Sequence, residues 1–408
     1  MKSRLNGKAL IGQSGGPTCV INQSLVGALE EAGKHPEIES VYGAVHGIQG
    51  VLAQDMIDLG CESEATLDLV RTTPSAALGS VRKKPTEEEC AEILRIFRAH
   101  DIRYFFYIGG NDSAETASII HRLAEESGYE IRISHIPKTI DNDLLVTDHC
   151  PGFGSAARFV ALASIGDDLD NRALKGIKID IIMGRHAGFL TAAAGIGRTE
   201  EDDGPHLIYF PDVPFSVGGF LADVEACMKK WDRCVVACSE GIADKEHRPI
   251  LTAILGAGEK DSHGNVALSG TGALGDYLAG EVKTKLGVKR VRADTFGYLQ
   301  RCFPTVVSDV DQREARDVGA FAVRAMTSGG ETSGSVAIRR LPGETYVSEL
   351  FITPLSTVAK KTRSLDPAFI AESGHDITPA FRRYALPLAG SLPRVGRLRG
   401  KRVPRKEP

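Results

Sequence analysis

The chain has 408 residues, 42% of them hydrophobic and 25% charged, and its formal net charge is −4. This composition is ordinary for a globular enzyme and excludes collagen-like and largely disordered chains. No apolar run reaches the roughly 18 residues of a membrane span, and residues 1–7 lack a signal-peptide core, so we expect a cytoplasmic protein without membrane partners. The length predicts two lobes, each with its own core.

Short apolar runs alternate with longer amphipathic segments through most of the chain, a pattern typical of βαβ units and largely parallel sheets. Strands are expected at residues 9–12, 40–44, 103–108, 131–136, 177–183, 207–210, 234–239, 290–293 and 335–340. Helices are expected at residues 20–32, 86–99, 113–127, 155–174, 218–231, 271–286 and 310–327. The sequence therefore predicts an α/β fold.

Four of these strands are followed by an unusual polar or glycine-rich motif. In chain order the motifs are Gly15-Gly16-Pro17, Gly109-Gly110-Asn111-Asp112-Ser113, Pro137 to Asp143, and Gly184-Arg185-His186. Because ligands bind in the crevice at the carboxyl ends of parallel strands, motifs that share this location indicate one composite site.

The motif at residues 109–113 has features of a phosphate-binding turn. Gly110 lets the backbone approach an anion, and Ser113 can cap the helix that follows and point its amides at that anion. Taken alone, a simple βα turn explains the glycines equally well. Asp112 is harder to explain, because a carboxylate repels a phosphate unless a divalent metal lies between them. The motif therefore predicts Mg²⁺ as a cofactor.

The heptapeptide Pro137-Lys138-Thr139-Ile140-Asp141-Asn142-Asp143 places a cation, a hydroxyl and two carboxylates just past a β-branched run. A carboxylate can accept the proton of an attacking hydroxyl, while a lysine offsets the charge of the group that is transferred. The heptapeptide therefore indicates phosphoryl transfer.

Later strand ends and loops add further candidate ligands. Arg185 can hold a phosphate or sugar oxygen, and Glu240 can accept hydrogen bonds from sugar hydroxyls. Arg292 and Arg301 suit the bidentate recognition of a terminal phosphate monoester. Taken singly, each of these residues is explained equally well as a surface charge or a surface ion pair.

Together the motifs resemble the phosphofructokinase family over about residues 8–355. The motifs that occur in that family's order and spacing are Gly15-Gly16-Pro17, Leu78-Gly79-Ser80-Val81-Arg82, Gly109 to Ser113, Pro137 to Asp143, Met183-Gly184-Arg185, Ser239-Glu240-Gly241 and Gly297-Tyr298-Leu299-Gln300-Arg301. The resemblance implies two doubly wound, Rossmann-like lobes between which the chain crosses more than once.

We expect residues 1–150 and about 255–325 to form a phosphoryl-donor lobe, and about 151–254 and 326–390 to form a sugar-phosphate lobe. Residues 391–408 carry seven Lys or Arg and one Glu without hydrophobic periodicity, which predicts a basic flexible tail. Nucleic-acid or membrane attraction is the alternative for this tail, but a solvated tail is the simpler interpretation. We therefore expect no nucleic-acid partner.

The resemblance also implies roles for individual residues. Asp141 corresponds to the general base for the sugar 1-hydroxyl, and Lys138 and Asp112 complete the expected catalytic set. The expected substrate-binding residues are Thr139, Asp143, Met183, Gly184, Arg185, Glu240, Arg292, Tyr298 and Arg301, with Tyr298 and Arg301 on the 6-phosphate. The expected donor-binding residues are Gly15, Gly16, Arg82, Gly110 and Ser113. Arg292 resembles an arginine contributed across a subunit interface, which implies a homodimer or homotetramer.

Two positions resemble the pyrophosphate-dependent branch of the family. Members that use ATP usually carry glycine where this chain has Asp112 and Lys138. A carboxylate at 112 would fall where the α-phosphate of ATP must lie, and two like charges about 4 Å apart cost on the order of 4 kcal/mol at an effective dielectric near 20. Pyrophosphate has no α-phosphate, and Lys138 can neutralise the transferring group. The alternative is that Lys138 faces solvent.

The leading hypothesis is a reversible, Mg²⁺-dependent phosphorylation of fructose 6-phosphate by pyrophosphate, a step of glycolysis and gluconeogenesis. The alternatives are an ATP-dependent phosphofructokinase, the same chemistry on sedoheptulose 7-phosphate, and a catalytically silent phosphosugar-binding subunit. Asn111 replaces the family's usual metal-binding aspartate, so the ligand of Mg²⁺ stays open among Asn111, Asp112, Asp143 and pyrophosphate itself. Gly176 stands where many members have a second cross-subunit arginine, and either Lys175 or Lys178 can substitute for it.

The eight cysteines are scattered along the chain without a Cys-x-x-Cys pair. This distribution predicts neither a disulfide framework nor a zinc site. We expect most of the cysteines to be small buried hydrophobic residues.

Overall fold

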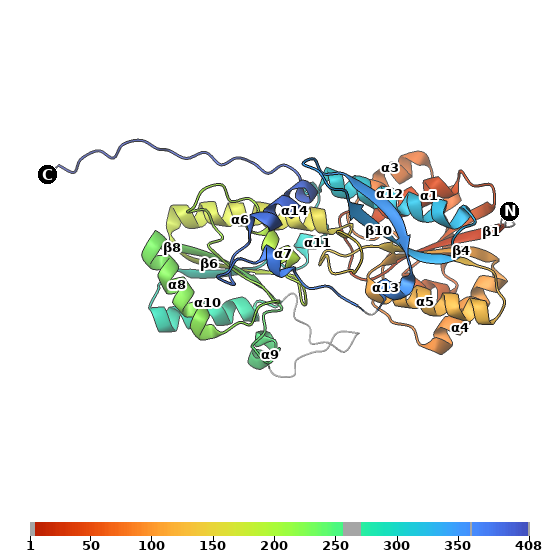
Figure 1. The fold of residues 1–408 in the computed structure, drawn as a ribbon, viewed down its shortest axis with the longest axis horizontal. Coiled ribbons are helices and arrows are strands. Elements are labelled where there is room, and N and C mark those ends of the chain that lie inside the picture. The colour runs from red at the N-terminus through yellow and green to blue at the C-terminus, as the bar shows by residue number, and fades with distance from the viewer. Residues whose placement is uncertain (1–4, 256–270, 360, 407–408) are drawn as a thin grey trace.

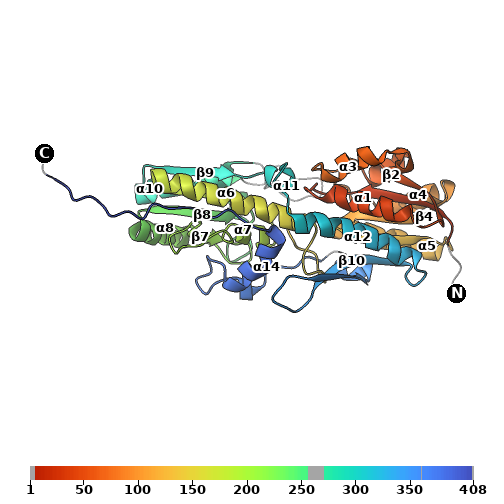
Figure 2. The same ribbon diagram turned by 90° about the horizontal axis from the view of Figure 1, so that it is seen from above.

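The computed structural model describes residues 5–255, 271–359 and 361–406. Two lobes lie side by side along the long axis of the molecule, and each is built on its own β-sheet (Figure 1). The helices α6 (Phe153–Leu174) and α12 (Asp309–Thr327) run along that axis, one in each lobe, and meet end to end (Figure 2). Sheets of mostly parallel strands with helices on both faces confirm the expected fold class.

The first sheet has seven strands in the order β11-β10-β5-β4-β1-β2-β3. Its parallel strands are β1 (Gly7–Gln13), β2 (Ile38–Ala44), β4 (Ile102–Gly109), β5 (Arg132–Pro137) and β10 (Ser333–Arg340). The short edge strands β3 (Met56–Asp58) and β11 (Ser348–Thr353) pair antiparallel.

Alternating side chains of the first sheet enter two different cores. Ala9 and Ile11 pack with α1 (Ile21–Ala32) and α12, whereas Leu10 packs on the opposite face. The remaining helices of this lobe are α2 (Ile48–Ala53), α3 (Glu64–Thr72), α4 (Glu87–Ala99), α5 (Asn111–Glu126) and α13 (Leu355–Val358). Because the sheet is covered on both faces, its central strands read as continuous apolar runs.

The second sheet has four parallel strands in the order β7-β8-β6-β9. They are β7 (Leu207–Tyr209), β8 (Arg233–Ser239), β6 (Gly176–Ile182) and β9 (Val291–Thr295). One face packs against α8 (Val217–Trp231), α9 (Ile250–Leu255) and α10 (Ala273–Leu286), and the other against α6, α7 (Phe189–Ala193) and α14 (Pro379–Ala389). The short helix α11 (Leu299–Cys302) follows β9.

Strand pairing corrects the expected division of the chain. β9 pairs with β6, so residues 291–295 belong to the second sheet and not to the first. β10 pairs with β5, so residues 333–340 belong to the first sheet and not to the second. Local sequence cannot show which sheet a short strand joins, because both sheets offer an edge to a parallel strand.

The unexpected elements of the C-terminal part include β11 and α14. β11 is short, and most of its side chains are only half-buried, so its hydrophobic pattern is weak. α14 contains Pro387, which usually interrupts a helix. Here Thr378 caps the helix and Pro379 starts it, while Pro387 lies in the last turns, where helix α14 is about to end.

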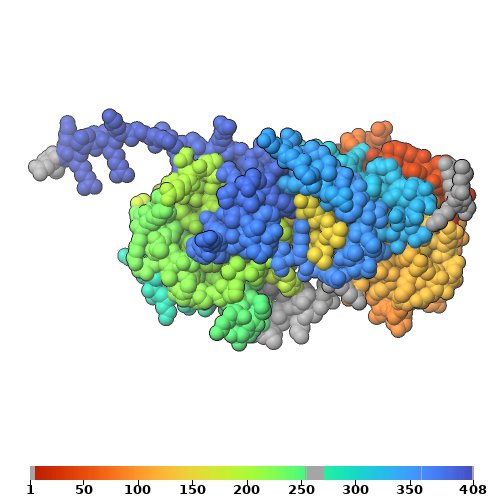
Figure 3. Space-filling model, viewed as in Figure 1, coloured from red at the N-terminus to blue at the C-terminus, as the bar shows by residue number. Residues whose placement is uncertain are grey.

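The basic tail leaves the body of the molecule (Figure 3). Residues 391–406 form no helix or strand, and Arg397 pairs with Asp202 and Asp203 near the start of this segment. No helix in the described part of the chain combines the length and apolarity needed to cross a membrane. Flexibility of the tail stays a prediction.

Candidate active site

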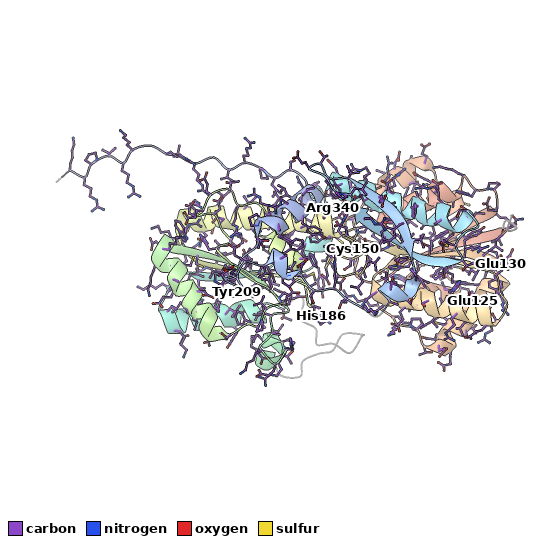
Figure 4. The ribbon with its side chains drawn as sticks, viewed as in Figure 1. Glu125, Glu130, Cys150, His186, Tyr209 and Arg340 are labelled. Carbon is purple, nitrogen blue, oxygen red and sulfur yellow. The ribbon has the colours of Figure 1, made fainter. Side chains whose placement is uncertain are left out.

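A crevice of about 1110 Å³ lies where the two lobes meet. The first lobe lines it with the loops after β1, β4 and β5, and the second lobe with the loops after β6 and β8. Figure 4 labels His186, a lining residue, and Cys150 in this middle part of the molecule. The carboxyl ends of parallel strands from both sheets thus face one space, as expected for an α/β ligand site.

Most of the expected site residues line this crevice. They are Gly15, Gly16, Arg82, Gly110, Asn111, Asp112, Ser113, Lys138, Thr139, Asp141, Asp143, Met183, Arg185, Glu240 and Arg301. Glu240 is buried, which excludes the alternative of an exposed loop acid.

Three expected residues, all described by the structure, lie outside the lining. Gly184 sits in the turn behind it, where its carbonyl accepts a hydrogen bond of 2.6 Å from Ser239 Oγ. The exposed Arg292 donates to the carbonyl of Val291 instead of pointing into the crevice. Tyr298 is 54% exposed, and its ring lies 4.5 Å from the guanidinium of Arg301. Within a single chain Arg292 therefore points away from the crevice, and Tyr298 lies beside it against Arg301.

Lys138 is only 3% exposed, so the alternative in which it faces solvent is wrong. Its Nζ donates a hydrogen bond of 2.7 Å to the carbonyl of Gly16. A Cβ at position 15, where φ is +77°, would lie 3.1 Å from this Nζ, so glycine there both permits the turn and leaves room for the ammonium. Burial, with Arg301 and Arg82 adding to it, lowers the pKa of Lys138 to about 7.

Lys138, Arg82 and Arg301 converge on the Gly15–Gly16 turn. A Cβ at Gly16 would lie 2.6 Å from one terminal nitrogen of Arg301 and 3.4 Å from one of Arg82. The Nε of Arg301 is buried without a hydrogen-bond partner among the residues that the structure describes. Because Arg301 comes from the second lobe, the two lobes together form a concentrated cationic patch that suits an anion.

The two carboxylates of the heptapeptide belong to Asp141 and Asp143. They flank Asn142, whose φ of 58° lies in the left-handed region. Burial, with Asp143 and Glu240 adding to it, raises the pKa of Asp141 to about 7. Burial also raises the pKa of Asp143. A carboxylate with a pKa near neutrality is well matched to general base chemistry.

The crevice offers Mg²⁺ the oxygen ligands that this ion prefers. Asp112, Asp141 and Asp143 line it, whereas the side-chain oxygen of Asn111 accepts a hydrogen bond from the amide of Asp112. Among the described residues, the carboxylates close enough together to cage an ion are Asp167, Asp180 and Asp294, outside this crevice. The residues therefore fit Mg²⁺ held by one or two carboxylates together with phosphate oxygens and water.

Several lining residues were missed by the sequence analysis. His186 directly follows Arg185, so the motif itself contained the signal. Lys84 pairs with Glu115, one turn into α5, at 2.7 Å. Thr362 reaches the crevice from a segment far along the chain, for which local sequence carries no signal.

Comparison with known proteins matches residues 8–326 to the family Phosphofructokinase. The "Pyrophosphate--fructose 6-phosphate 1-phosphotransferase" of Rhodospirillum rubrum is 53% identical over 97% of this chain and 98% of its own length. The "Sulfofructose kinase" of Alkalicoccus urumqiensis is 33% identical over 88% of this chain and 91% of its own length. A solved "Pyrophosphate-dependent phosphofructokinase" from Nitrosospira multiformis superposes with a TM-score of 0.85 at 34% identity, covering 97% of this chain and 94% of the other. The chain therefore belongs to the phosphofructokinase family.

Proposed function

We propose that the protein is a pyrophosphate-dependent phosphofructokinase, which transfers a phosphoryl group from pyrophosphate to the 1-hydroxyl of fructose 6-phosphate. The names of its full-length relatives support this reaction. The observation that carries the choice of donor is the buried ammonium of Lys138, which lies 2.7 Å from the Gly16 carbonyl in a crevice that Asp112 also lines.

Lys138 and Asp112 favour a short donor over a nucleotide. The lysine fills space beside the glycine turn with a positive charge, which suits a compact phosphate anion. The Asp112 carboxylate adds negative charge where a longer polyphosphate chain with its nucleoside would have to pass. ATP therefore meets a repulsion that pyrophosphate avoids.

The reaction follows from the positions of three side chains. Asp141 accepts the proton of the sugar 1-hydroxyl while that oxygen attacks one phosphorus of pyrophosphate and the bridging P–O bond breaks. Lys138 and Arg82 stabilise the charge that develops on the transferred group and on the departing phosphate. A bound Mg²⁺, with Asp112 and Asn111 as its expected ligands, would neutralise further phosphate charge.

The two lobes divide the binding work in this proposal. Gly15, Gly16, Gly110 and Ser113 of the first lobe hold the donor. The sugar lies against Thr139, Met183, Arg185 and Glu240, with Asp143 nearby. Arg301 holds the 6-phosphate.

The assembly completes the sugar-phosphate site. Arg292 is exposed on the second lobe, and we assign it to the site of a neighbouring copy, whereas Tyr298 lies against Arg301 of its own chain. We therefore propose a homodimer or homotetramer that acts in the cytoplasm. The reaction runs in both directions, because the phosphate ester that forms and the phosphoanhydride that breaks have comparable free energies of hydrolysis.

A coupled assay of the purified protein with pyrophosphate and ATP side by side tests the proposal. We expect turnover with fructose 6-phosphate and pyrophosphate in the presence of Mg²⁺, and a higher kcat/KM for fructose 6-phosphate than for sedoheptulose 7-phosphate. Turnover supported by ATP and not by pyrophosphate would show that the donor assignment is wrong. Binding of the sugar without turnover from either donor would instead indicate a silent binding subunit.

A further inference from the structure

The loop that carries Asp141 is held by a part of the chain that lies far beyond the family match. Residues 138–152, here named the catalytic loop, connect β5 to α6 and contain no helix or strand. Residues 361–366, here named the strap, run from the α13 side of the first lobe toward the second lobe (Figure 1). The match to the family ends at residue 326, before the strap begins.

One strap residue, Arg363, makes four hydrogen bonds to the backbone of the catalytic loop. Its Nε donates to the carbonyl of Asn142 at 2.8 Å, and its two terminal nitrogens donate to the carbonyls of Thr147 at 3.0 Å and Asp148 at 2.8 Å. Its backbone amide donates to the carbonyl of Asp143 at 2.8 Å. Asn142 directly follows Asp141, whereas Thr147 and Asp148 lie later in the same loop. One planar guanidinium therefore holds two separate stretches of the loop backbone.

Arg363 is itself held in place from the second lobe. Its guanidinium lies 4.7 Å from the ring of Phe189, at the start of α7. Its neighbour Leu365 is buried, and the amide of Leu365 donates to Asp212 at 2.8 Å. The strap therefore connects the catalytic loop to the core of the second lobe at Phe189 and to the loop after β7 at Asp212.

A second contact secures the same loop from α14. The side-chain amide of Asn142 donates to the hydroxyl of Tyr384 at 2.7 Å, and that hydroxyl donates to the carbonyl of Asp148 at 2.8 Å. The side-chain oxygen of Asn142 accepts from the amide of Cys150 at 2.9 Å. Asn142 adopts φ 58°, a left-handed conformation that asparagine tolerates better than most other non-glycine residues. In Figure 3 a yellow patch, the colour of residues near 150, is framed by the blue C-terminal part of the chain.

We propose that Arg363 is a positioning residue of the phosphoryl transfer, which sets the place of Asp141 through the loop backbone without touching the substrates. This inference rests on the proposed function. General base catalysis depends on the distance between the carboxylate and the hydroxyl, and a displacement of about 1 Å can lower the rate roughly 10²-fold. A loop released from Arg363 therefore loses catalytic rate while the binding residues on other strand ends stay in place.

Steady-state kinetics of Arg363→Ala test this role, with Lys361→Ala as the matched control because Lys361 is an exposed cation of the same strap. For Arg363→Ala we expect a fall in kcat of about 10²-fold, with the KM values for sugar and pyrophosphate changed less than about threefold. Added guanidinium ion should restore part of the rate, since it can reoccupy the site between the carbonyls. Lys361→Ala should keep the wild-type kcat.

A second variant and a second readout keep the test decisive if Arg363→Ala folds poorly. Arg363→Lys retains the charge and much of the packing but cannot span three carbonyls, so we expect a lowered kcat with the fold intact. Hydrogen exchange should become faster in residues 139–152 of either variant and stay unchanged elsewhere. Wild-type kcat in folded Arg363→Lys, or a loss of thermal stability alone, would overturn the inference. Absence of pyrophosphate turnover in the wild-type protein would instead contradict the proposed function.

Discussion

The two walls of the crevice differ in how completely one chain builds them. The first-lobe wall gathers the buried Lys138 and the half-buried Asp141 on a single loop, where each pKa is moved toward neutrality. The second-lobe wall contributes Arg301, but Arg292 and Tyr298 stay on the exposed surface. The contrast fits the proposal that one chain holds the reacting groups, whereas a neighbouring copy completes the grip on the sugar phosphate.

The largest effect is expected on the first-lobe wall, at the general base. Asp141→Asn keeps the shape of the side chain but cannot accept the hydroxyl proton, so kcat should fall by about 10³- to 10⁴-fold. Calorimetry of fructose 6-phosphate binding should give a Kd close to that of the wild-type protein. Unchanged turnover would remove Asp141 from this role.

The next largest effect concerns the ammonium beside the donor turn. Lys138→Ala removes a positive charge that we expect to stabilise the transition state, so kcat should fall by about 10²- to 10³-fold. Lys83→Ala is the control, because Lys83 also lines the crevice but pairs with Glu89. Equal losses in the two variants would mean that Lys138 adds only to the general positive charge of the crevice.

A smaller effect is expected from the second-lobe wall. Arg292→Ala should raise the KM for fructose 6-phosphate by roughly tenfold with little change in kcat, since it removes binding that the ground and transition states share. If Arg292 acts in the neighbouring copy, mixing Arg292→Ala with Asp141→Asn subunits restores sites that contain both native residues. Low-KM activity should then appear in the mixture, and its absence after subunit exchange would place Arg292 outside the site.

The smallest effect is a shift in the pH profile. Since the pKa of Asp141 is raised to about 7, kcat/KM should fall below pH 7 as the base becomes protonated. Since the pKa of Lys138 is lowered to about 7, kcat/KM should also fall above pH 7 as the ammonium loses its proton. Glu240→Gln removes a negative charge near Asp141, so the acid limb should move to lower pH by less than about one unit. An acid limb that moves to higher pH would contradict this electrostatic account.

Much of the first-lobe wall could be predicted from the sequence because its residues follow strands directly. Asp112, Lys138 and Asp141 stand in short motifs at strand ends, and the parallel sheet brings those ends together. The fold class followed from the same alternation of strands and helices. The sheets to which β9 and β10 belong could not be predicted in this way, because strand pairing depends on contacts between distant segments.

The support of the catalytic loop could not be predicted. Arg363 lies 221 residues from Asn142, and Tyr384 lies 242 residues from it. Their partners are mostly backbone carbonyls, which leave no mark on the side-chain pattern of the loop. The position of Arg301 beside the Gly15–Gly16 turn likewise depends on how the two lobes meet.

The central claim is that Lys138 and Asp112 select pyrophosphate over ATP. The most direct test measures kcat/KM for both donors in the wild-type protein and in the double variant Asp112→Gly, Lys138→Gly. We expect the wild-type protein to prefer pyrophosphate, and we expect the double variant to lower the pyrophosphate-to-ATP ratio by at least about tenfold, which corresponds to about 1.4 kcal/mol. An unchanged ratio, or a wild-type protein that prefers ATP, would contradict the account.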